Sequence, residues 1–193
     1  LASFPFMLGR MVTRKVLIPI YREKPPHESA ENFTALRRMR VLVSLALLSA
    51  LLGVAFAGVW LVDLLYDDRY AMAGAIVVAL AAMQVPQIVG LTYDHAAMAA
   101  GDSRQFFVVA ATRAVLVLAA LVIGFEVAGL VGALIAQGIG VLLSYPVLIR
   151  AARRHGAWDP AHDAFFLLLG AAGAAAAAWV NAPALADLAA ATM

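Results

Sequence analysis

Residues 41–62, VLVSLALLSALLGVAFAGVWLV, contain no charged side chain. A helix needs about 20 mostly apolar residues to cross the hydrocarbon layer of a bilayer, and this stretch is long enough. A strand of a transmembrane barrel would be shorter and would alternate apolar and polar residues, and the stretch shows no such alternation. It therefore predicts a transmembrane α-helix and favours an all-α membrane protein.

Similar stretches fill most of the chain. We expect five further crossings, which gives about six in one transmembrane bundle over residues 1–193. The segment 105–125 is interrupted only by Arg113, whereas the first segment carries three basic residues. The further crossings are expected near residues 1–21, 70–93, 105–125, 127–149 and 164–186.

The composition agrees with a protein solvated by lipid. The 193 residues are 64% hydrophobic and 13% charged, with a mean hydropathy of +0.90. A soluble domain is about 45–50% apolar and about 25% charged. The net charge of +2 provides no cationic surplus for nucleic acid. Because the chain has no Cys, disulfides, Cys-ligated zinc and thiol nucleophiles are excluded.

The charges of the connecting loops alternate in sign, which predicts the orientation. Basic loops face the cytoplasm by the positive-inside rule, and the acidic ends face outward. The chain opens directly in apolar sequence without the features of a signal peptide, and we interpret it as a fragment that begins inside a larger protein. The expected cytoplasmic segments are Arg22–Arg40, Arg104 and Arg150–Arg154, and the expected outer ones are Asp63–Arg69, Glu126 and Asp187.

Small residues and prolines predict how the helices pack and bend. Glycine lets helix backbones approach closely in lipid, and Pro86 and Pro146 should kink their crossings. The glycines concerned are Gly124, Gly129, Gly132, Gly138 and Gly140.

Basic side chains inside the predicted crossings are the main candidates for a binding site. Arg10 and Arg14 are four residues apart and share a helix face. A charge deep in the bilayer is costly unless it faces water or a partner. These two residues are therefore either a cationic wall for an anionic substrate or, as for Lys15, charges that reach the interface. Arg113 lies near the middle of its crossing. This position indicates that it either lines a polar cavity or forms an ion pair with Asp94 or Asp102.

Two further polar groups are less specific. Gln84, Pro86 and Gln87 interrupt the third crossing, which predicts a kink with local hydrogen bonds, or else a hinge or substrate contact. His155, Asp159, His162 and Asp163 match no metal-ligand spacing, so we interpret them as a solvated loop. We find no catalytic residues, no metal site and no cofactor motif, and the sequence favours a protein that is not an enzyme.

Three stretches together resemble a known family. Leu17–Arg22 has an aliphatic-Pro-aliphatic helix end followed by a basic residue. Leu64–Gly74 is similar to a short external turn, with Asp67 in place of a usual Gly. VAGLVGALIAQGIGVLLSYPVLIRAARR (residues 127–154) has a Gly-x-x-Gly-Ala opening and a basic end. These motifs, in this order, resemble the bacterial lipid-linked oligosaccharide (O-antigen and exopolysaccharide) flippases of the multidrug/oligosaccharidyl-lipid/polysaccharide exporter superfamily, from Leu1 to about Arg154.

The resemblance implies a fold and a function. The chain would be most of the second of two six-helix bundles that face each other across a cavity, preceded by an N-terminal bundle. It would flip a polyprenyl-pyrophosphate-linked oligosaccharide across the bacterial inner membrane without a cofactor. Its partners would be that lipid, the bilayer, the N-terminal bundle and the polysaccharide assembly machinery. The pyrophosphate would be bound by Arg10, Arg14, Arg113 and Lys15.

Other functions remain open at this point. A multidrug exporter of the same superfamily would need carboxylates in its cavity for cationic drugs, whereas the deep charges here are positive. A membrane-embedded enzyme of polysaccharide assembly would need clustered acids or a metal motif, and only Asp159, His162 and Asp163 approach one. A helical scaffold without a substrate is the third alternative.

Overall fold

The protein is all-helical, as the hydropathy predicts. The computed structural model describes residues 1–192, and within them it contains no strand. Three helices, α2, α6 and α7, are long and apolar enough to cross a membrane. The elements are α1 (Phe4–Glu23), α2 (Ala30–Leu65), the short 3-10 helix η1 (Asp68–Tyr70), α3 (Ala71–Met83), α4 (Val85–Gly90), α5 (Ala96–Ala99), α6 (Ser103–Arg154), α7 (Pro160–Val180) and α8 (Ala182–Thr192).

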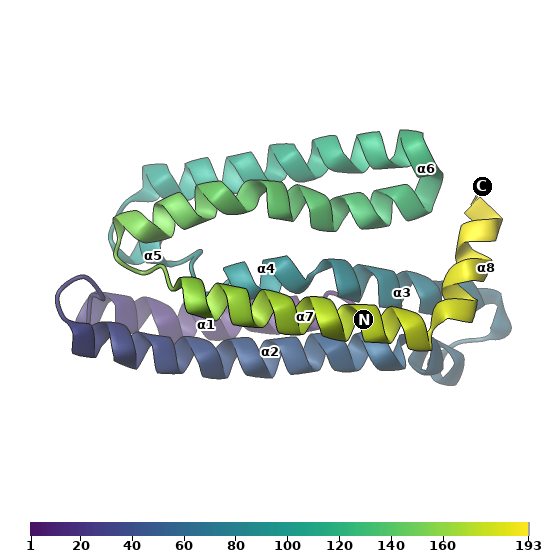
Figure 1. Cartoon of the computed structure of the whole chain (residues 1–193), viewed down its shortest axis with the longest axis horizontal. Helices are drawn as coiled ribbons and strands as arrows, with labels where there is room; N and C mark the ends of the chain where they lie inside the picture. Colours follow the sequence, from purple (N-terminus) through teal and green to yellow (C-terminus); the bar gives the residue numbers. More distant parts are fainter. Residues whose placement is uncertain (193) are drawn as a thin grey trace.

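Most helices run along the long axis of the molecule. α1, α2, α3–α4 and α7 form one group, and α6 lies along one side of it (Figure 1). The main core lies where α2 meets α3, α4 and α7. There Leu48, Leu51, Ile88 and Phe166 are almost completely buried.

The long helix α6 is a hairpin. Ala128 and Gly129 leave helical geometry, and Gly129 has a positive φ of 55°. The chain reverses there and returns alongside itself (Figure 1), so α6 consists of two antiparallel arms, residues 103–127 and 130–154. Each arm of about 25 residues is roughly 37 Å long at 1.5 Å per residue. The two arms correspond to the predicted crossings at 105–125 and 127–149.

Glycines hold the two arms of α6 close together. A Cβ on Gly132 would collide with the carbonyl oxygen of Gly124, and a Cβ on Gly140 would lie 2.7 Å from Val117 Cα. The predicted close approach of small residues is therefore present within α6 itself. Pro146 lies in the second arm, where the backbone angles remain helical.

Two of the predicted crossings are broken helices. The stretch 70–93 divides at Gln84 into α3 and α4, and α4 ends at Gly90. The stretch 164–186 divides at Asn181, whose side-chain amide donates to the carbonyl of Ala177 at 2.8 Å. Beyond this point α8 turns away from the axis of α7 (Figure 1).

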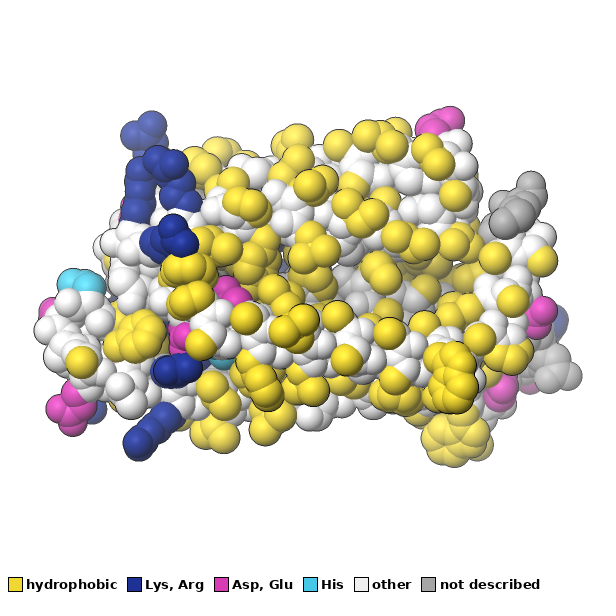
Figure 2. All heavy atoms as spheres, viewed as in Figure 1, with side chains coloured by type: hydrophobic (Ala, Val, Ile, Leu, Met, Phe, Trp, Pro, Cys, Tyr) yellow, Lys and Arg dark blue, Asp and Glu magenta, His cyan; other side chains and the backbone are white. Residues whose placement is uncertain are grey.

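The surface is apolar in the middle and charged at the ends. In Figure 2, hydrophobic side chains cover most of the face, and Lys and Arg gather at one end. Large side chains such as Phe107, Leu118 and Trp179 are more than half exposed. Such a surface would be unfavourable in water and fits a lipid environment.

Candidate functional site

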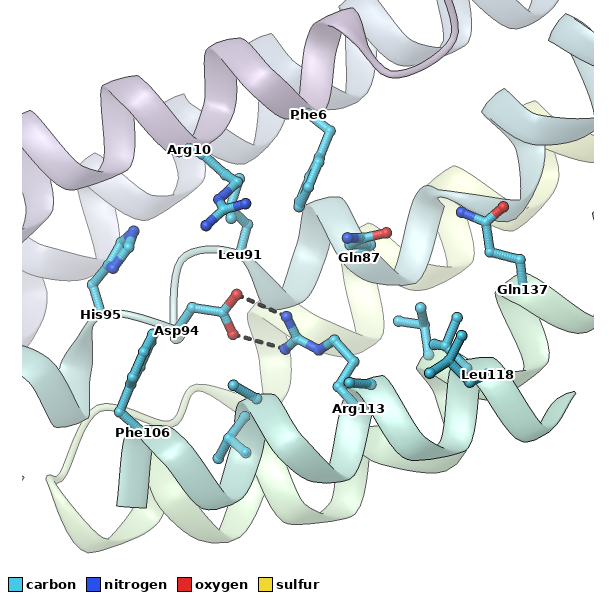
Figure 3. Close-up of a pocket in the computed structure, with 15 residues that line it drawn as sticks. Phe6, Arg10, Gln87, Leu91, Asp94, His95, Phe106, Arg113, Leu118 and Gln137 are labelled. Carbon is cyan, nitrogen blue, oxygen red and sulfur yellow. Dashed lines mark hydrogen bonds and ion pairs between the residues drawn. The ribbon is translucent and has the colours of Figure 1, made fainter. Parts of the chain in front are cut away.

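A cavity of about 510 Å³ lies between α1, the segment from α4 to α5, and both arms of α6 (Figure 3). Its size falls within the range of small-molecule sites, about 300–1,000 Å³. Its wall is mostly apolar, with polar side chains at a few positions. The polar and charged lining residues are Arg10, Gln87, Asp94, His95, Arg113 and Gln137.

Arg113 forms a two-pronged ion pair with Asp94. Its Nη1 and Nη2 donate to the two carboxylate oxygens of Asp94 at 2.9 and 2.7 Å. Asp94 lies in the turn after α4, and Arg113 lies in the first arm of α6, so the pair joins two separate elements. The sequence left open whether Arg113 lines a cavity or pairs with a carboxylate, and it does both.

Arg10 reaches the same cavity from α1. Figure 3 shows its guanidinium group pointing into the cavity, on the side of Asp94. The guanidinium carbon is 5.9 Å from the centre of the Phe6 ring. Among the described residues Arg10 makes no ion pair, so its charge is available to a ligand in the cavity.

Arg14 and Lys15 do not line this cavity. Both are exposed on α1, one turn or more beyond Arg10. The structure therefore brings together Arg10 and Arg113 of the predicted cationic set and leaves Arg14 and Lys15 outside.

His95 is a cavity residue that the sequence did not single out. It is buried, and neither ring nitrogen has a hydrogen-bond partner within the described residues. Burial lowers the pKa of His95; Asp94 raises it in part, and the charges of Arg10 and Arg14 lower it further. The surroundings of His95 therefore disfavour its charged form.

The polar break of the third crossing has two roles. Gln84 is buried and its amide donates to the carbonyls of Leu80 at 3.3 Å and Ala2 at 3.2 Å. It thereby satisfies a backbone group near the break, and Pro86 is the second residue of the next helix, α4. Gln87, one turn on, lines the cavity.

A second polar cluster contradicts the interpretation of residues 155–163 as a solvated loop. Asp159, His162 and Asp163 are buried at the start of α7. Tyr93 donates from its hydroxyl to Asp163 at 2.6 Å, and His162 Nε2 lies 2.9 Å from Ser44 Oγ. Asp159 caps α7 and Pro160 opens it. That pattern, an N-cap residue followed by Pro, is the sequence signal that places a helix start there.

Arg40 belongs to this second cluster rather than to an exposed loop. It is completely buried, and its Nη2 donates to the hydroxyl of Tyr21 at 2.9 Å. Its guanidinium group lies 4.3 Å from the centre of the Tyr93 ring, in the range of a cation–π contact. No sequence signal separates Arg40 from its exposed neighbours Arg37 and Arg38. The cluster links α1, α2, the α4–α5 segment and α7.

The two clusters differ in what they can do. In residues 1–192, no group of three or more His, Asp or Glu side chains is placed to hold a metal ion. The second cluster is packed among helices, although Nε and Nη1 of its buried Arg40 have no hydrogen-bond partner within the described residues. The cavity, in contrast, offers space beside Arg10, a cation without an ion pair among those residues. The cavity is therefore the candidate binding site.

Comparisons of the chain with family models, curated proteins and solved structures return no match. The resemblance to the flippases consequently remains a hypothesis that rests on the motifs of the sequence.

Proposed function

We propose that this chain is part of a membrane transporter that moves a polyprenyl-pyrophosphate-linked oligosaccharide between leaflets. Six crossings are proposed: α1, α2, α3–α4, the two arms of α6, and α7–α8. The observation that carries the proposal is the cavity lined by Arg10, which makes no ion pair within residues 1–192, and by the Arg113–Asp94 pair. The exposed apolar surface and the three candidate spans support a location in the membrane.

The cavity chemistry suits a phosphorylated group. Arg presents planar forked donors that match phosphate oxygens. Arg10 makes no ion pair in the described structure, and Arg113 already displays the two-pronged geometry on a carboxylate. A phosphate that enters the cavity would contact Arg10 and compete with Asp94 for Arg113. In this proposal the sugars occupy hydrated space beside the bundle and the polyprenyl chain stays in lipid, against the apolar face of α6.

One observation favours a second candidate, a multidrug exporter of the same superfamily. Asp94 is a carboxylate in the cavity wall, as the binding of a cationic drug would require. Both of its oxygens, however, are taken by Arg113, and the cavity has two Arg side chains for one carboxylate. The balance of charge favours an anionic substrate.

The test is complementation of a flippase-null strain by the full-length product of the gene, with surface polysaccharide normalised to protein in the membrane. Arg10→Gln is the decisive variant. Because Arg10 makes no ion pair in the described structure, removal of its charge leaves no carboxylate without a partner. It should reduce surface polysaccharide at least tenfold, and Arg10→Lys should retain part of it. Arg22→Gln, an exposed substitution on the same helix, is the control.

Two outcomes would contradict the proposal. Full complementation by Arg10→Gln would show that the cavity charge is not used. Drug resistance that depends on Asp94 but not on Arg10 would identify the exporter instead.

A further inference from the structure

Four arginines meet at one end of the α6 hairpin. Arg104 is the second residue of the first arm, and Arg150, Arg153 and Arg154 lie in the last turns of the second. Because the arms are antiparallel, the two groups lie at the same end of the molecule, where Figure 2 shows a concentration of Lys and Arg. We call these four residues the arginine end of α6. They lie outside the lining of the cavity described above.

The arginine end has two adjacent hollows that share side chains. The first, of about 490 Å³, lies between the arms and has Arg104, Arg150 and Arg154 in its wall. The second, of about 680 Å³, lies against the second arm and has Arg150, Arg153 and Arg154 in its wall. Arg150 and Arg154 therefore border both hollows.

The charge of these hollows is poorly compensated. Within the described residues Arg104, Arg150 and Arg154 form no ion pair. Arg153 is stacked 3.9 Å from the centre of the Trp158 ring. Asp102 is the acidic side chain in the first wall, and His155 Nε2 lies 3.8 Å from it.

The hollows are apolar beneath the arginines. Val108 and Val147 line the first, and Pro146 and Ile149 line the second. The neighbouring outer surface of α6 is also apolar, and its most apolar stretch has no buried residue. A ligand with both phosphates and hydrocarbon chains can use the charges and this surface together, whereas a soluble anion can use only the charges.

We propose that the arginine end of α6 binds the headgroup of an anionic phospholipid with two phosphates, of the diphosphatidylglycerol type. One phosphate would occupy each hollow, with Arg150 and Arg154 between them, and the acyl chains would follow the outer face of α6. Basic pockets between transmembrane helices at the cytoplasmic side recognise such headgroups. This inference rests on the insertion of α6 in a membrane and is independent of the transported substrate.

The test is lipid binding to the purified full-length protein in a neutral detergent. Diphosphatidylglycerol, phosphatidylglycerol and phosphatidylcholine of equal chain length are added separately, and bound lipid is measured by native mass spectrometry together with the melting temperature. We expect diphosphatidylglycerol to bind most tightly and phosphatidylcholine to leave the protein unchanged. The triple variant Arg104→Gln/Arg150→Gln/Arg154→Gln should weaken binding by roughly fivefold for each Arg removed.

A matched control removes the same charge elsewhere. Arg22→Gln/Lys24→Gln/Arg38→Gln lies on exposed positions at the predicted cytoplasmic side and should bind diphosphatidylglycerol like the wild type. If the triple variant does not fold, Arg150→Gln alone removes one of the two shared side chains and should still weaken binding severalfold. Equal losses in the variant and the control would overturn the site. Equal binding of phosphatidylglycerol would overturn the two-phosphate headgroup, and equal stabilisation by millimolar inorganic phosphate would overturn the lipid.

Discussion

Removal of the Asp94 carboxylate tests the central ion pair of the cavity. In Asp94→Asn, Arg113 keeps its charge but loses the partner that accepts both of its donors. The side chains are only 19% and 16% exposed, so water replaces that partner poorly. The loss of one member of a buried pair costs about 3–5 kcal/mol. Because both side chains keep some exposure in the cavity, we expect Asp94→Asn to lower the free energy of unfolding by about 3 kcal/mol, the lower end of this range.

The assay is thermal unfolding of the full-length protein in detergent. A loss of about 3 kcal/mol corresponds to a fall of roughly 6–12 °C in Tm for a domain of this size. The double variant Asp94→Asn/Arg113→Gln should be more stable than Asp94→Asn, because it leaves no charge uncompensated. The control is Asp67→Asn: Asp67 pairs with Arg69 at 3.3 Å, and both side chains are more than three-quarters exposed. Asp67→Asn should change the free energy of unfolding by less than about 0.5 kcal/mol.

The reasoning is refuted by either of two results. If Asp94→Asn matches Asp67→Asn within the error of the Tm, the pair contributes nothing to stability. If the losses of stability in Asp94→Asn and in Arg113→Gln add in the double variant, Asp94 and Arg113 do not interact.

Three further predictions concern topology, packing and pH. Cysteines introduced at Ser29 and Asp67 should label from opposite sides of the membrane, with Asp67 outside; labelling from one side contradicts the six crossings. Gly132→Leu should sharply reduce the folded yield in detergent because the arms of α6 touch at this position, whereas Gly53→Leu should not, because a Cβ added there meets no atom within 4 Å. Burial lowers the pKa of His95, so the folded state binds fewer protons than the unfolded state below about pH 6.5. The Tm should fall as the pH drops from 7 to 5, and His95→Gln should reduce this dependence of the Tm on pH.

Hydropathy predicted the helical class because a spanning helix needs little more than length and apolar character. The reversal within α6 was also accessible, since the run of apolar residues is too long for one crossing and Glu126 marks its middle. The break at Gln84 was predicted from Gln84, Pro86 and Gln87, and its local hydrogen bond to Leu80 is present. The break at Asn181 was not predicted, because an amide bonded to its own helix leaves the same sequence pattern as one that faces a cavity.

The candidate site was predicted only in part, because sequence gives depth and helix face but not the partner. Arg113 was identified by its depth, and Asp94 was named as one of its two nearest carboxylates. Arg10 and Arg14 share a face, yet only Arg10 lines the cavity, because neighbouring helices decide where the cavity ends. Arg40 was assigned to an exposed basic loop. Its burial depends on Tyr21, which lies in α1, and on Tyr93, which is remote in sequence.

The tight reversal at Ala128 and Gly129 bears on how the protein enters the membrane. The two arms of α6 meet through glycines with no intervening loop, and Glu126 is the charged residue beside the turn. A hairpin with so short a tip can partition into the bilayer as a single unit, because its arms already satisfy their backbone hydrogen bonds. In the proposed orientation Glu126 is the charged group of the tip that passes through the hydrocarbon, and Arg113 enters it only partway. The arginines at the open end would stay on the side of synthesis.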